Sequence, residues 1–589
     1  MKIIKKEEHS VLYDLGALQN GVLTFSYAAK EGRAAECFYG PYPDFIIFRC
    51  KYDAKEREGR LFCRSKKLVT ARYLCVRTEN FPAEEVKVQF EGKMYGLHRT
   101  GTFSCENELY NRMFSVCEHT LDCCVFPHTQ GNSTFDLQSE KSRRFALSWH
   151  GKHTDYVIVD GARRDREVWV GDLYPEIRNV WALFSEREVI RNPFDVILDQ
   201  MREDGFIPAS SISMQVFYEY NCWFLLVLED YLKVSGDVEY YRENADKAER
   251  ILEYILGRLQ DGFLDLGKMQ TWAWTSSRCG RITSSHCVLY GALCAMARMK
   301  RILDGDERAA ARYESIAREL RARINAGAYD AANSLYYNVI GTRGRYSLDA
   351  GGLAVLFGVC EEQNAKKVLH SMKEKFRTPY GSLLYYPKEI PDGQNFVHND
   401  HIWPFVNTFE LEALLQRGET EQAQELLETG WGGMLKNGAE TFWEVIDGSN
   451  GKFMKTRMNN PPDDRDTWNS ECHGWSAGLP YLFFTYFAGV RPAAYGYGEI
   501  LFSPVPSSLQ QIDAKFATRY GEIESHIRQN GDSREAVLIC PEQVKVHLGP
   551  QVSMLSRKAE GGKATFVMRF SGRDMFSLPE GTEQERSIV

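Results

Sequence analysis

The stretch D-G-A-R-R-D-R-E-V-W-V-G-D-L-Y-P-E, residues 160–176, decides both the fold and the function that this sequence predicts. Its aspartates Asp160, Asp165 and Asp172 lie five and seven residues apart, and neither helical nor strand periodicity places them on one face. We therefore predict an irregular loop, the kind of segment that often carries a site. A solvated, self-neutralising charge run is the alternative. Trp169 inside the run, and the amphipathic helix pattern that follows, favour a pocket for a polyol.

The run resembles the acidic motif of glycoside hydrolase family 78, the inverting α-L-rhamnosidases. In that family an Asp, an acid five residues on and an Asp seven residues further on surround the sugar, and Trp169-Val170-Gly171-Asp172 matches the Trp-x-Gly-Asp ending of the motif. The resemblance implies that Asp165 is the general acid and that Asp160 and Asp172 accept hydrogen bonds from sugar hydroxyls. The acid of the family is usually Glu, so Asp165 is a departure and Glu167 is the alternative proton donor.

A second motif, G-A-E-T-F-W-E over residues 438–444, resembles the Gly-Ala-Thr-Thr-x-Trp-Glu sequence of the same family. The final Glu of that sequence is the general base, which implies this role for Glu444. Glu440 stands where the family usually has Thr, and we interpret it as a supporting or surface residue. An exposed acid pair at helical spacing is the alternative. An inverting glycosidase needs a protonated and an ionised carboxyl about 6.5 to 9.5 Å apart, so motifs this distant in sequence must meet where loops converge.

Further residues complete the predicted sugar pocket. His473 matches a pocket histidine of the family and opens the last predicted helix of the helical region, where a structural cap is the alternative. We expect Arg164 and Arg166 to hold neighbouring carboxylates ionised. Several tryptophans offer walls for the methyl group of a deoxy sugar, with core packing as the alternative for each. The predicted catalytic residues are Asp165 and Glu444, and the predicted substrate-binding residues are Asp160, Arg164, Trp169, Asp172, Trp274, Trp403, Trp443 and His473.

Length and composition limit the classes of protein that fit. A chain of 589 residues suggests two to four domains, unless one large helical barrel takes most of it. The hydrophobic content of 43% and the charged content of 26% are ordinary for a soluble globular protein. A net charge of −8 argues against a nucleic-acid surface, which needs a basic face. The aromatic content of 13% suits sugar binding, because aromatic rings offer flat apolar faces.

Sequence features also bear on location and partners. Residues 1–6 carry no apolar core of a signal peptide, and no run reaches the length of a membrane span. The 15 cysteines, an odd number, are typical of reduced cytosolic thiols. We therefore expect a cytoplasmic protein that binds carbohydrate, rhamnosides by the resemblance, with neither nucleic acid nor membrane as partner. The oligomeric state stays open, with a homodimer as one option.

The N-terminal part of the chain has strand patterns. Two apolar runs on either side of a turn at Asn20-Gly21 predict a β-sandwich over residues 1–103. Residues 104–174 are expected to hold a linker helix, capped by Ser104 and running to Cys124, and then the acidic loop.

Residues 175–488 show one helix pattern after another, and many of the helices are followed by Gly, the expected left-handed stop. Elaborate loops between alternate helices suit an (α/α)6 barrel with its loops at one end. Strands around an Asn530-Gly531 turn predict a second β-sandwich over 489–572, and 573–589 is expected to be a disordered tail. The predicted fold is thus multidomain and mainly α. Predicted helices include Pro193–Glu203, Tyr218–Val234, Asp237–Ile255, Ser285–Leu303, Glu307–Ala326, Glu361–Phe376, Pro404–Gln416, Glu419–Gly430 and Gly474–Ala488.

No metal or cofactor is predicted. His398, Asp400 and His401 match no zinc signature, and residues 463–466 lack the Gly and the distal Glu of a calcium loop. We also find no Walker loop, dinucleotide fingerprint or Gly-x-Ser-x-Gly elbow.

The predicted function is that of an inverting exo-glycoside hydrolase that releases terminal α-L-rhamnose from oligosaccharides or glycosides. One alternative is a hydrolase with the same barrel that acts on another sugar. Two departures from the family would favour it: Asp165, and Ala273 at a position where relatives often have an acidic residue. The others are an inverting phosphorylase, in which phosphate replaces the base, and a non-catalytic sugar-binding protein.

Overall fold

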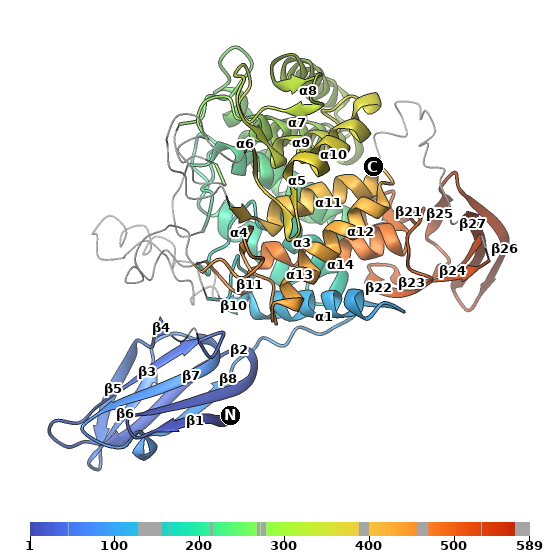
Figure 1. Ribbon diagram of the computed structural model, residues 1–589. Coiled ribbons are helices and arrows are strands. Elements are labelled where there is room, and N and C mark those ends of the chain that lie inside the picture. Colours follow the sequence, from blue (N-terminus) through green and yellow to red (C-terminus); the bar gives the residue numbers. More distant parts are fainter. Residues whose placement is uncertain are drawn as a thin grey trace.

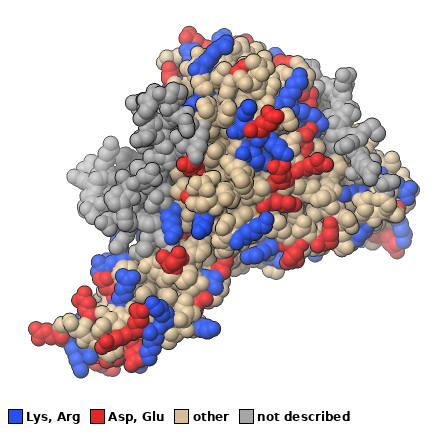
Figure 2. Space-filling view, in the orientation of Figure 1, with Lys and Arg blue, Asp and Glu red and all other residues tan. Residues whose placement is uncertain are grey.

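The computed structural model describes residues 1–44, 46, 48–127, 156–163, 165–211, 216–267, 271–272, 278–387, 400–455, 469–531 and 533–571. An N-terminal sheet, a large helical region and C-terminal sheets follow one another along the chain, and the helical region lies between the two sheet regions (Figure 1). On the face shown in Figure 2, acidic and basic side chains are interspersed among the described residues. Within the described ranges, we find no helix whose length and apolar content would let it cross a bilayer.

Eight strands form the N-terminal sheet, in the order β4-β3-β7-β2-β6-β5, with β1 and β8 also paired to β2. Buried apolar side chains on these strands make a core of their own, separate from the larger core of the helical region. The strands are β1 (Lys2–Glu7), β2 (Ser10–Ala28), β3 (Ala34–Gly40), β4 (Phe48–Arg49), β5 (Tyr52–Arg57), β6 (Arg60–Ser65), β7 (Val69–Glu79) and β8 (Lys87–Gly92).

The predicted turn at Asn20-Gly21 is wrong, because β2 runs unbroken through it. The side chain of Asn20 is buried and tied to other segments: its amide donates to the Cys123 carbonyl at 2.9 Å, and its Oδ1 accepts from Thr70 Oγ1 at 2.6 Å. These long-range hydrogen bonds hold the Asn-Gly pair in the strand, against its local preference for a hairpin turn. The bond to Cys123 also joins the N-terminal sheet to the first helix.

The segment after the N-terminal sheet crosses to the far side of the molecule. Strand β9 (Thr102–Cys105) pairs with β22 (Gln511–Thr518) of the C-terminal sheet, so Ser104 lies in a strand and the predicted N-cap there is wrong. Helix α1 (Glu108–Cys123) begins after Asn107, whose side chain accepts the Leu109 N–H at 3.0 Å.

The helices of the central region form a succession of hairpins. Helix α3 packs on α5, α5 on α7, α7 on α9 and α9 on α11, while α14 returns to α3, and each of the first five is followed by a helix that packs against it. The helices after α1 are α3 (Leu173–Leu183), α4 (Glu188–Leu198), α5 (Tyr218–Ser235), α6 (Val238–Leu256), α7 (Thr283–Met299), α8 (Glu307–Ala328), α9 (Leu348–Leu356), α10 (Glu362–Phe376), α11 (Pro404–Gln416), α12 (Thr420–Thr429), α13 (Trp431–Lys436) and α14 (Leu479–Leu482).

The chain returns to strands after the helices. A three-stranded sheet has the order β20-β21-β25, and a six-stranded sheet has the order β26-β27-β24-β23-β22-β9. The predicted Asn530-Gly531 turn is confirmed, since it joins β23 to β24 and Gly531 has a φ of 60°. The remaining strands are β20 (Val490–Pro492), β21 (Glu499–Phe502), β23 (Gly521–Asn530), β24 (Ser533–Pro541), β25 (Lys545–Leu548), β26 (Val552–Glu560) and β27 (Lys563–Ser571).

Candidate active site

Asp160 organises the acidic loop. Its Oδ2 accepts the Asp165 N–H at 2.9 Å, its Oδ1 accepts the Glu167 N–H at 2.9 Å, and its own N–H donates to the Glu167 carbonyl at 3.1 Å. Charge-assisted bonds of this kind are strong and favour the ionised carboxylate. The loop is therefore folded around one buried carboxylate, in the irregular form that the sequence predicts.

Glu444 lies in a clamp made by two neighbouring segments. Its N–H donates to the Ser470 carbonyl at 2.8 Å, and its Oε2 accepts the Ser470 N–H at 2.6 Å. The carbonyl of Trp443 accepts from Ser476 Oγ at 2.6 Å. Glu444 has no exposed surface, so these bonds replace the water that an ionised carboxylate would otherwise need.

Backbone hydrogen bonds join both motifs to the segment around His473. The Ala162 N–H donates to the Cys472 carbonyl at 3.1 Å, the Gly474 N–H to the Asp160 carbonyl at 2.6 Å, and the His473 N–H to the Phe442 carbonyl at 2.9 Å. The segment around His473 thus lies between the acidic loop and the Glu444 motif and holds both.

The imidazole of His473 lies between two of the predicted sugar-binding acids. Its Nε2 is 3.7 Å from Asp160 Oδ2, and its Nδ1 is 3.9 Å from Asp172 Oδ1. All three side chains are buried. The structure therefore brings these three predicted residues into one group.

The electrostatics of Asp172 involve acids from both motifs. Burial raises the pKa of Asp172 well above its usual range, and the negative charges of Asp160, Glu444 and Asp165 raise it further. Salt screens interactions between buried charges only weakly. The charges of the predicted acid, the predicted base and Asp160 therefore all act on Asp172.

Helix N-termini converge on the same place. Asp172 is the N-cap of α3, Trp403 is the N-cap of α11, and the first turns of α5 and α7 meet where Ser285 Oγ donates to Glu219 Oε2. The positive ends of helix dipoles favour nearby negative charge. This arrangement offsets part of the cost of burying so many carboxyl groups.

Arg166 does not act as expected. It donates to the carbonyl of Ala162 in the acidic loop at 2.6 Å, to the Leu68 carbonyl just before β7 at 2.7 Å and to Thr70 Oγ1 of β7 at 2.9 Å, and none of these three acceptors is a carboxylate. Burial lowers its pKa to about 10. Arg163 instead pairs with buried Glu471, with Nε 2.8 Å from Oε2. The predicted residue Arg164 lies outside the described residues.

Glu440 joins the second motif to the N-terminal sheet, as a supporting residue would. It forms an ion pair with Arg72 of β7, and Arg72 also bonds Asp14, with Nε 3.1 Å from Oδ1. The N-terminal sheet therefore touches both motifs of the site.

An aromatic wall lies beside His473. Trp475 stacks on His473 with ring centroids 4.2 Å apart and on Phe405 at 5.0 Å, and it meets the predicted residue Trp403 edge to face at 5.9 Å. Trp272 packs against Trp403 at 5.6 Å. Trp272 and Trp475 are not among the predicted site residues, although each lies within two residues of one, Trp272 near Trp274 and Trp475 near His473.

Other predicted tryptophans lie elsewhere in the site region. Trp169 stacks on Phe217 at 6.0 Å, and Trp443 packs on Phe453 at 5.8 Å, so core packing accounts for part of their surface. The predicted residue Trp274 and the neighbouring Ala273 lie outside the described residues.

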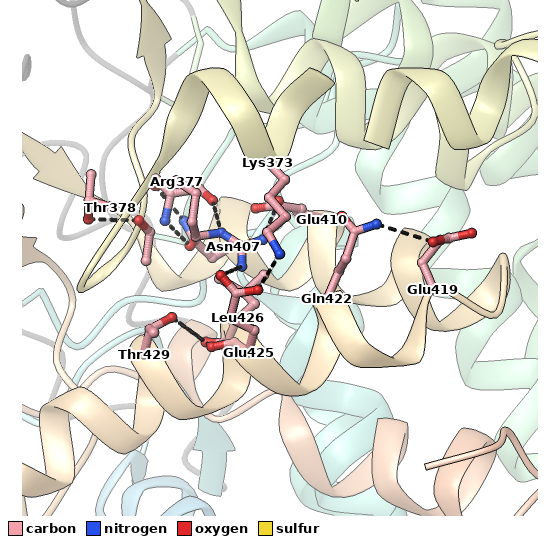
Figure 3. Close-up of polar contacts among 12 residues, drawn as sticks. Lys373, Arg377, Thr378, Asn407, Glu410, Glu419, Gln422, Glu425, Leu426 and Thr429 are labelled. Carbon is pink, nitrogen blue, oxygen red and sulfur yellow. Dashed lines mark hydrogen bonds and ion pairs between the residues drawn. The ribbon is translucent and has the colours of Figure 1, made fainter. Parts of the chain in front are cut away.

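The buried side chain of Asn407 positions the backbone of Trp403. The Asn407 side-chain amide donates to the carbonyls of Trp403 at 3.0 Å and Ser382 at 2.9 Å, while its Oδ1 accepts the Ser382 N–H at 2.8 Å. Next to it, Arg377 pairs with Glu410 of α11, with Nη2 2.7 Å from Oε1 (Figure 3). These contacts tie the hairpin before α11 to the start of that helix.

Among the described residues we find no group of three or more His, Cys, Asp or Glu side chains that could hold a metal ion. Asp400 and His401 are described, whereas His398 and the acidic residues at 463–466 lie outside the described ranges. Each of the fifteen cysteines, all within described residues, carries a free thiol.

Comparison with protein families finds two matched regions. The bacterial alpha-L-rhamnosidase 6 hairpin glycosidase domain matches residues 147–383, and the bacterial alpha-L-rhamnosidase C-terminal domain matches residues 489–559. A search of curated proteins found no match.

Solved structures of rhamnosidases have the same fold. A GH78 family rhamnosidase of Bacillus sp. GL1 is 18% identical with a TM-score of 0.68, over 93% of this chain and 54% of that one. An alpha-L-rhamnosidase from Dictyoglumus thermophilum is 15% identical with a TM-score of 0.66, over 96% of this chain and 63% of that one. A Klebsiella oxytoca rhamnosidase with rhamnose bound is 19% identical with a TM-score of 0.60, over 81% of this chain and 88% of that one. This chain thus spans less than two thirds of the first two.

Helical hairpins around a buried group of carboxyls, together with the match to the six-hairpin glycosidase domain, define the class of six-hairpin glycosidase folds. Within that class, the two family models together match just over half of the chain. The chain belongs to the bacterial α-L-rhamnosidase family.

Proposed function

We propose that this protein hydrolyses glycosides of α-L-rhamnose, releasing the terminal sugar with inversion at the anomeric carbon. One observation supports this proposal most: the segment around His473 joins two acidic motifs that are far apart in sequence, because the Gly474 N–H donates to the Asp160 carbonyl at 2.6 Å and the His473 N–H to the Phe442 carbonyl at 2.9 Å. Acids gathered in this way suit a reaction that needs one carboxyl to give a proton and another to take one.

In this proposal the helical region is an (α/α)6 barrel that holds the site at one end, between two β-sandwiches. The packing order from α3 through α5, α7 and α9 to α11, and from α14 back to α3, supports the barrel, and α11 packs against the short 3-10 helix Gly474–Ser476 that precedes α14. The shared location of helix N-termini supports a single functional end.

Glu444 is the proposed general base. The Ser470 N–H donates to its Oε2 at 2.6 Å, and a bond of this kind favours an ionised carboxylate that can take a proton from water. The same clamp fixes the direction of the carboxylate, because Ser470 bonds the Glu444 backbone as well.

Asp165 is the proposed general acid, and its backbone is fixed by the bond to Asp160. The alternative donor, Glu167, accepts a hydrogen bond from Ser210 Oγ at 2.6 Å, which engages its carboxylate and favours Asp165 for the proton transfer. In the reaction, Asp165 would protonate the glycosidic oxygen while Glu444 deprotonates the attacking water on the opposite face of the ring.

The remaining acids and rings bind the sugar in this proposal. Asp160, Asp172 and His473 would bond its hydroxyls, and a wall formed by Trp403 and Trp475 would cover its apolar face and methyl group. Trp169 and Trp443, with Arg164 and Trp274, are further proposed sugar contacts.

Hydrolysis of an aryl α-L-rhamnoside, compared with a panel of other aryl glycosides, tests the proposal. Glu444→Gln should lower kcat by several orders of magnitude with little change in sugar affinity, whereas Glu421→Gln, an exposed acid on α12, should change neither. Proton NMR of the first-formed sugar should show the β anomer. Turnover of another sugar in preference to rhamnose would support the alternative of a hydrolase with a different sugar specificity. Activity that needs phosphate would support the alternative of an inverting phosphorylase.

A cytoplasmic location and a homodimer stay predictions from the sequence. Fractionation of the native cells and size-exclusion chromatography with light scattering would test them.

A further inference from the structure

Glu176 is a buried acid that the proposed reaction does not use. It lies one turn after Asp172 on α3 and is 1% exposed. Neither of its carboxyl oxygens has a hydrogen-bond partner among the described residues. Buried polar groups are nearly always hydrogen-bonded, so a carboxyl in this state calls for an explanation.

The groups around Glu176 are negative or neutral. Asp172 lies on the same helix face at the i−4 position, and Asp160 lies across from it in the acidic loop. Cys124, the C-cap of α1, is buried as well, and burial is the main reason why its thiol pKa is raised well above the usual range, with a smaller contribution from Glu176. On the remaining side, a Cβ built on Gly474 would come 2.1 Å from Glu176 Oε1.

His473 can carry a positive charge and precedes Gly474 in the chain, but its ring nitrogens face the other two acids. Its nitrogens face Asp160 Oδ2 at 3.7 Å and Asp172 Oδ1 at 3.9 Å. A carboxylate at Glu176 would therefore be desolvated, unpaired and next to two other acids, which is the costliest state for such a group.

Two neighbouring carboxyls in this setting share one proton. Asp172 is the residue better suited to carry the negative charge, because it lies at the positive N-terminus of α3 and its Oδ1 faces His473 Nδ1 at 3.9 Å. Glu176 is the residue better suited to hold the proton, because burial and the charges of Asp172 and Asp160 raise its pKa well above the usual range.

We propose that Glu176 is a positioning residue that stays a neutral carboxylic acid in the working enzyme and directs its O–H at Asp172, which leaves Asp172 charged to accept a sugar hydroxyl. The role toward the sugar rests on the proposed function. The protonation state of Glu176 does not, so the two can be tested separately.

The first test measures stability and needs no activity. Above about pH 4.5 the unfolded chain loses the Glu176 proton while the folded chain keeps it, so the wild type loses stability as pH rises toward the raised folded pKa. Glu176→Gln has no such proton. Scanning calorimetry measures the difference in Tm between Glu176→Gln and the wild type. This difference should shift in favour of the variant by about 2 °C or more between pH 5 and pH 8. Glu188→Gln, at an exposed acid in the first turn of α4, should show no such trend.

The second test measures rate and sugar binding. Glu176→Gln keeps an N–H donor for Asp172 and should retain kcat/KM within a few-fold near pH 6, with an alkaline limb displaced to higher pH. Glu176→Met keeps the size but has no donor, and should raise KM for an aryl rhamnoside and the Kd of L-rhamnose about 10-fold or more.

Three results would overturn the proposal: a Tm difference for Glu176→Gln that does not change with pH, equal losses in the Gln and Met variants, or wild-type kinetics in both. If no variant or wild type hydrolyses any glycoside, the proposed function fails, while the calorimetric result still decides whether Glu176 is neutral.

Discussion

Arg278 and Asp349 form an ion pair in which neither side chain has any exposed surface, with Nη2 2.8 Å from Oδ2. The same Asp349 oxygen accepts the Trp272 indole N–H at 3.1 Å. Although burial opposes it, the charge of Arg278 lowers the pKa of Asp349. This pair therefore holds an indole of the aromatic wall through a charged acceptor.

Replacing Asp349 by Asn should destabilise the protein by about 3 to 5 kcal/mol, because it leaves the Arg278 charge buried and unpaired. It should also raise KM more than it lowers kcat, since Trp272 loses its charged acceptor and the wall loosens. Calorimetry and steady-state kinetics measure the two effects. The exposed ion pair of Arg242 and Glu239 is a matched control, and Glu239→Gln should change neither quantity. Wild-type stability in Asp349→Asn would refute the prediction.

Gly474 leaves room for the carboxyl of Glu176. A methyl group there would lie 2.1 Å from Oε1, and Glu176 is too buried to swing away. Gly474→Ala should cost about 1 to 3 kcal/mol by overpacking and should lower activity, because the Gly474 N–H bonds the Asp160 carbonyl at 2.6 Å.

The matched control is Gly433→Ala in α13. A Cβ at Gly433 meets nothing within 4 Å, so this change should stabilise the helix by up to about 1 kcal/mol. Equal Tm changes in the two variants would show that Glu176 adapts and that the contact is not restrictive.

Local sequence signals predicted much of the helical region. The helix predicted over Tyr218–Val234 is confirmed as α5, and Gly236 has the expected left-handed φ of 66°. The stop at Gly327 is wrong, since α8 runs to Ala328. Helix α9 was not predicted, because every one of its residues is buried and its sequence LDAGGLAVL has no polar face to set a period.

The site was predictable where a motif is contiguous. The acidic loop, Glu444 and His473 each have a local pattern that predicts a role, and hydrogen bonds of the segment around His473 join the two motifs, while the roles of these residues stay predictions. Arg166 was misjudged because a sequence does not show that Leu68 and Thr70 lie beside it. Glu176 has no distinguishing sequence signal, because an acid in the first turn of a helix is ordinary and only its burial makes it unusual.

Glu229 of α5 should contribute stability that depends on pH in the opposite sense to Glu176. It is buried, yet Arg298 and Lys233 lower its pKa to about 2, with Arg298 Nη2 2.5 Å from its Oε2. Because the folded pKa is below the unfolded value, this stability is present above about pH 4.5 and is lost as pH falls toward 2.

Glu229→Gln should therefore destabilise the protein by about 3 kcal/mol at pH 7 and by less than half of that at about pH 3. Urea unfolding of both proteins at the two pH values measures the difference. A penalty that stays constant with pH would mean that packing, and not charge, is what Gln loses.

The identity of the proton donor can be decided by leaving groups. A general acid matters most when the departing oxygen is a poor leaving group, so Asp165→Asn should lower kcat/KM about 10²- to 10⁴-fold for an alkyl rhamnoside and much less for an activated aryl one. Glu167→Gln is the matched comparison, because Glu167 lies two residues away and its carboxylate is held by Ser210 at 2.6 Å. It should affect both substrates alike, through the shape of the loop. A good leaving group can compensate for the loss of the proton donor. If Glu167→Gln shows the dependence on the leaving group and Asp165→Asn does not, Glu167 is therefore the general acid and Asp165 is not.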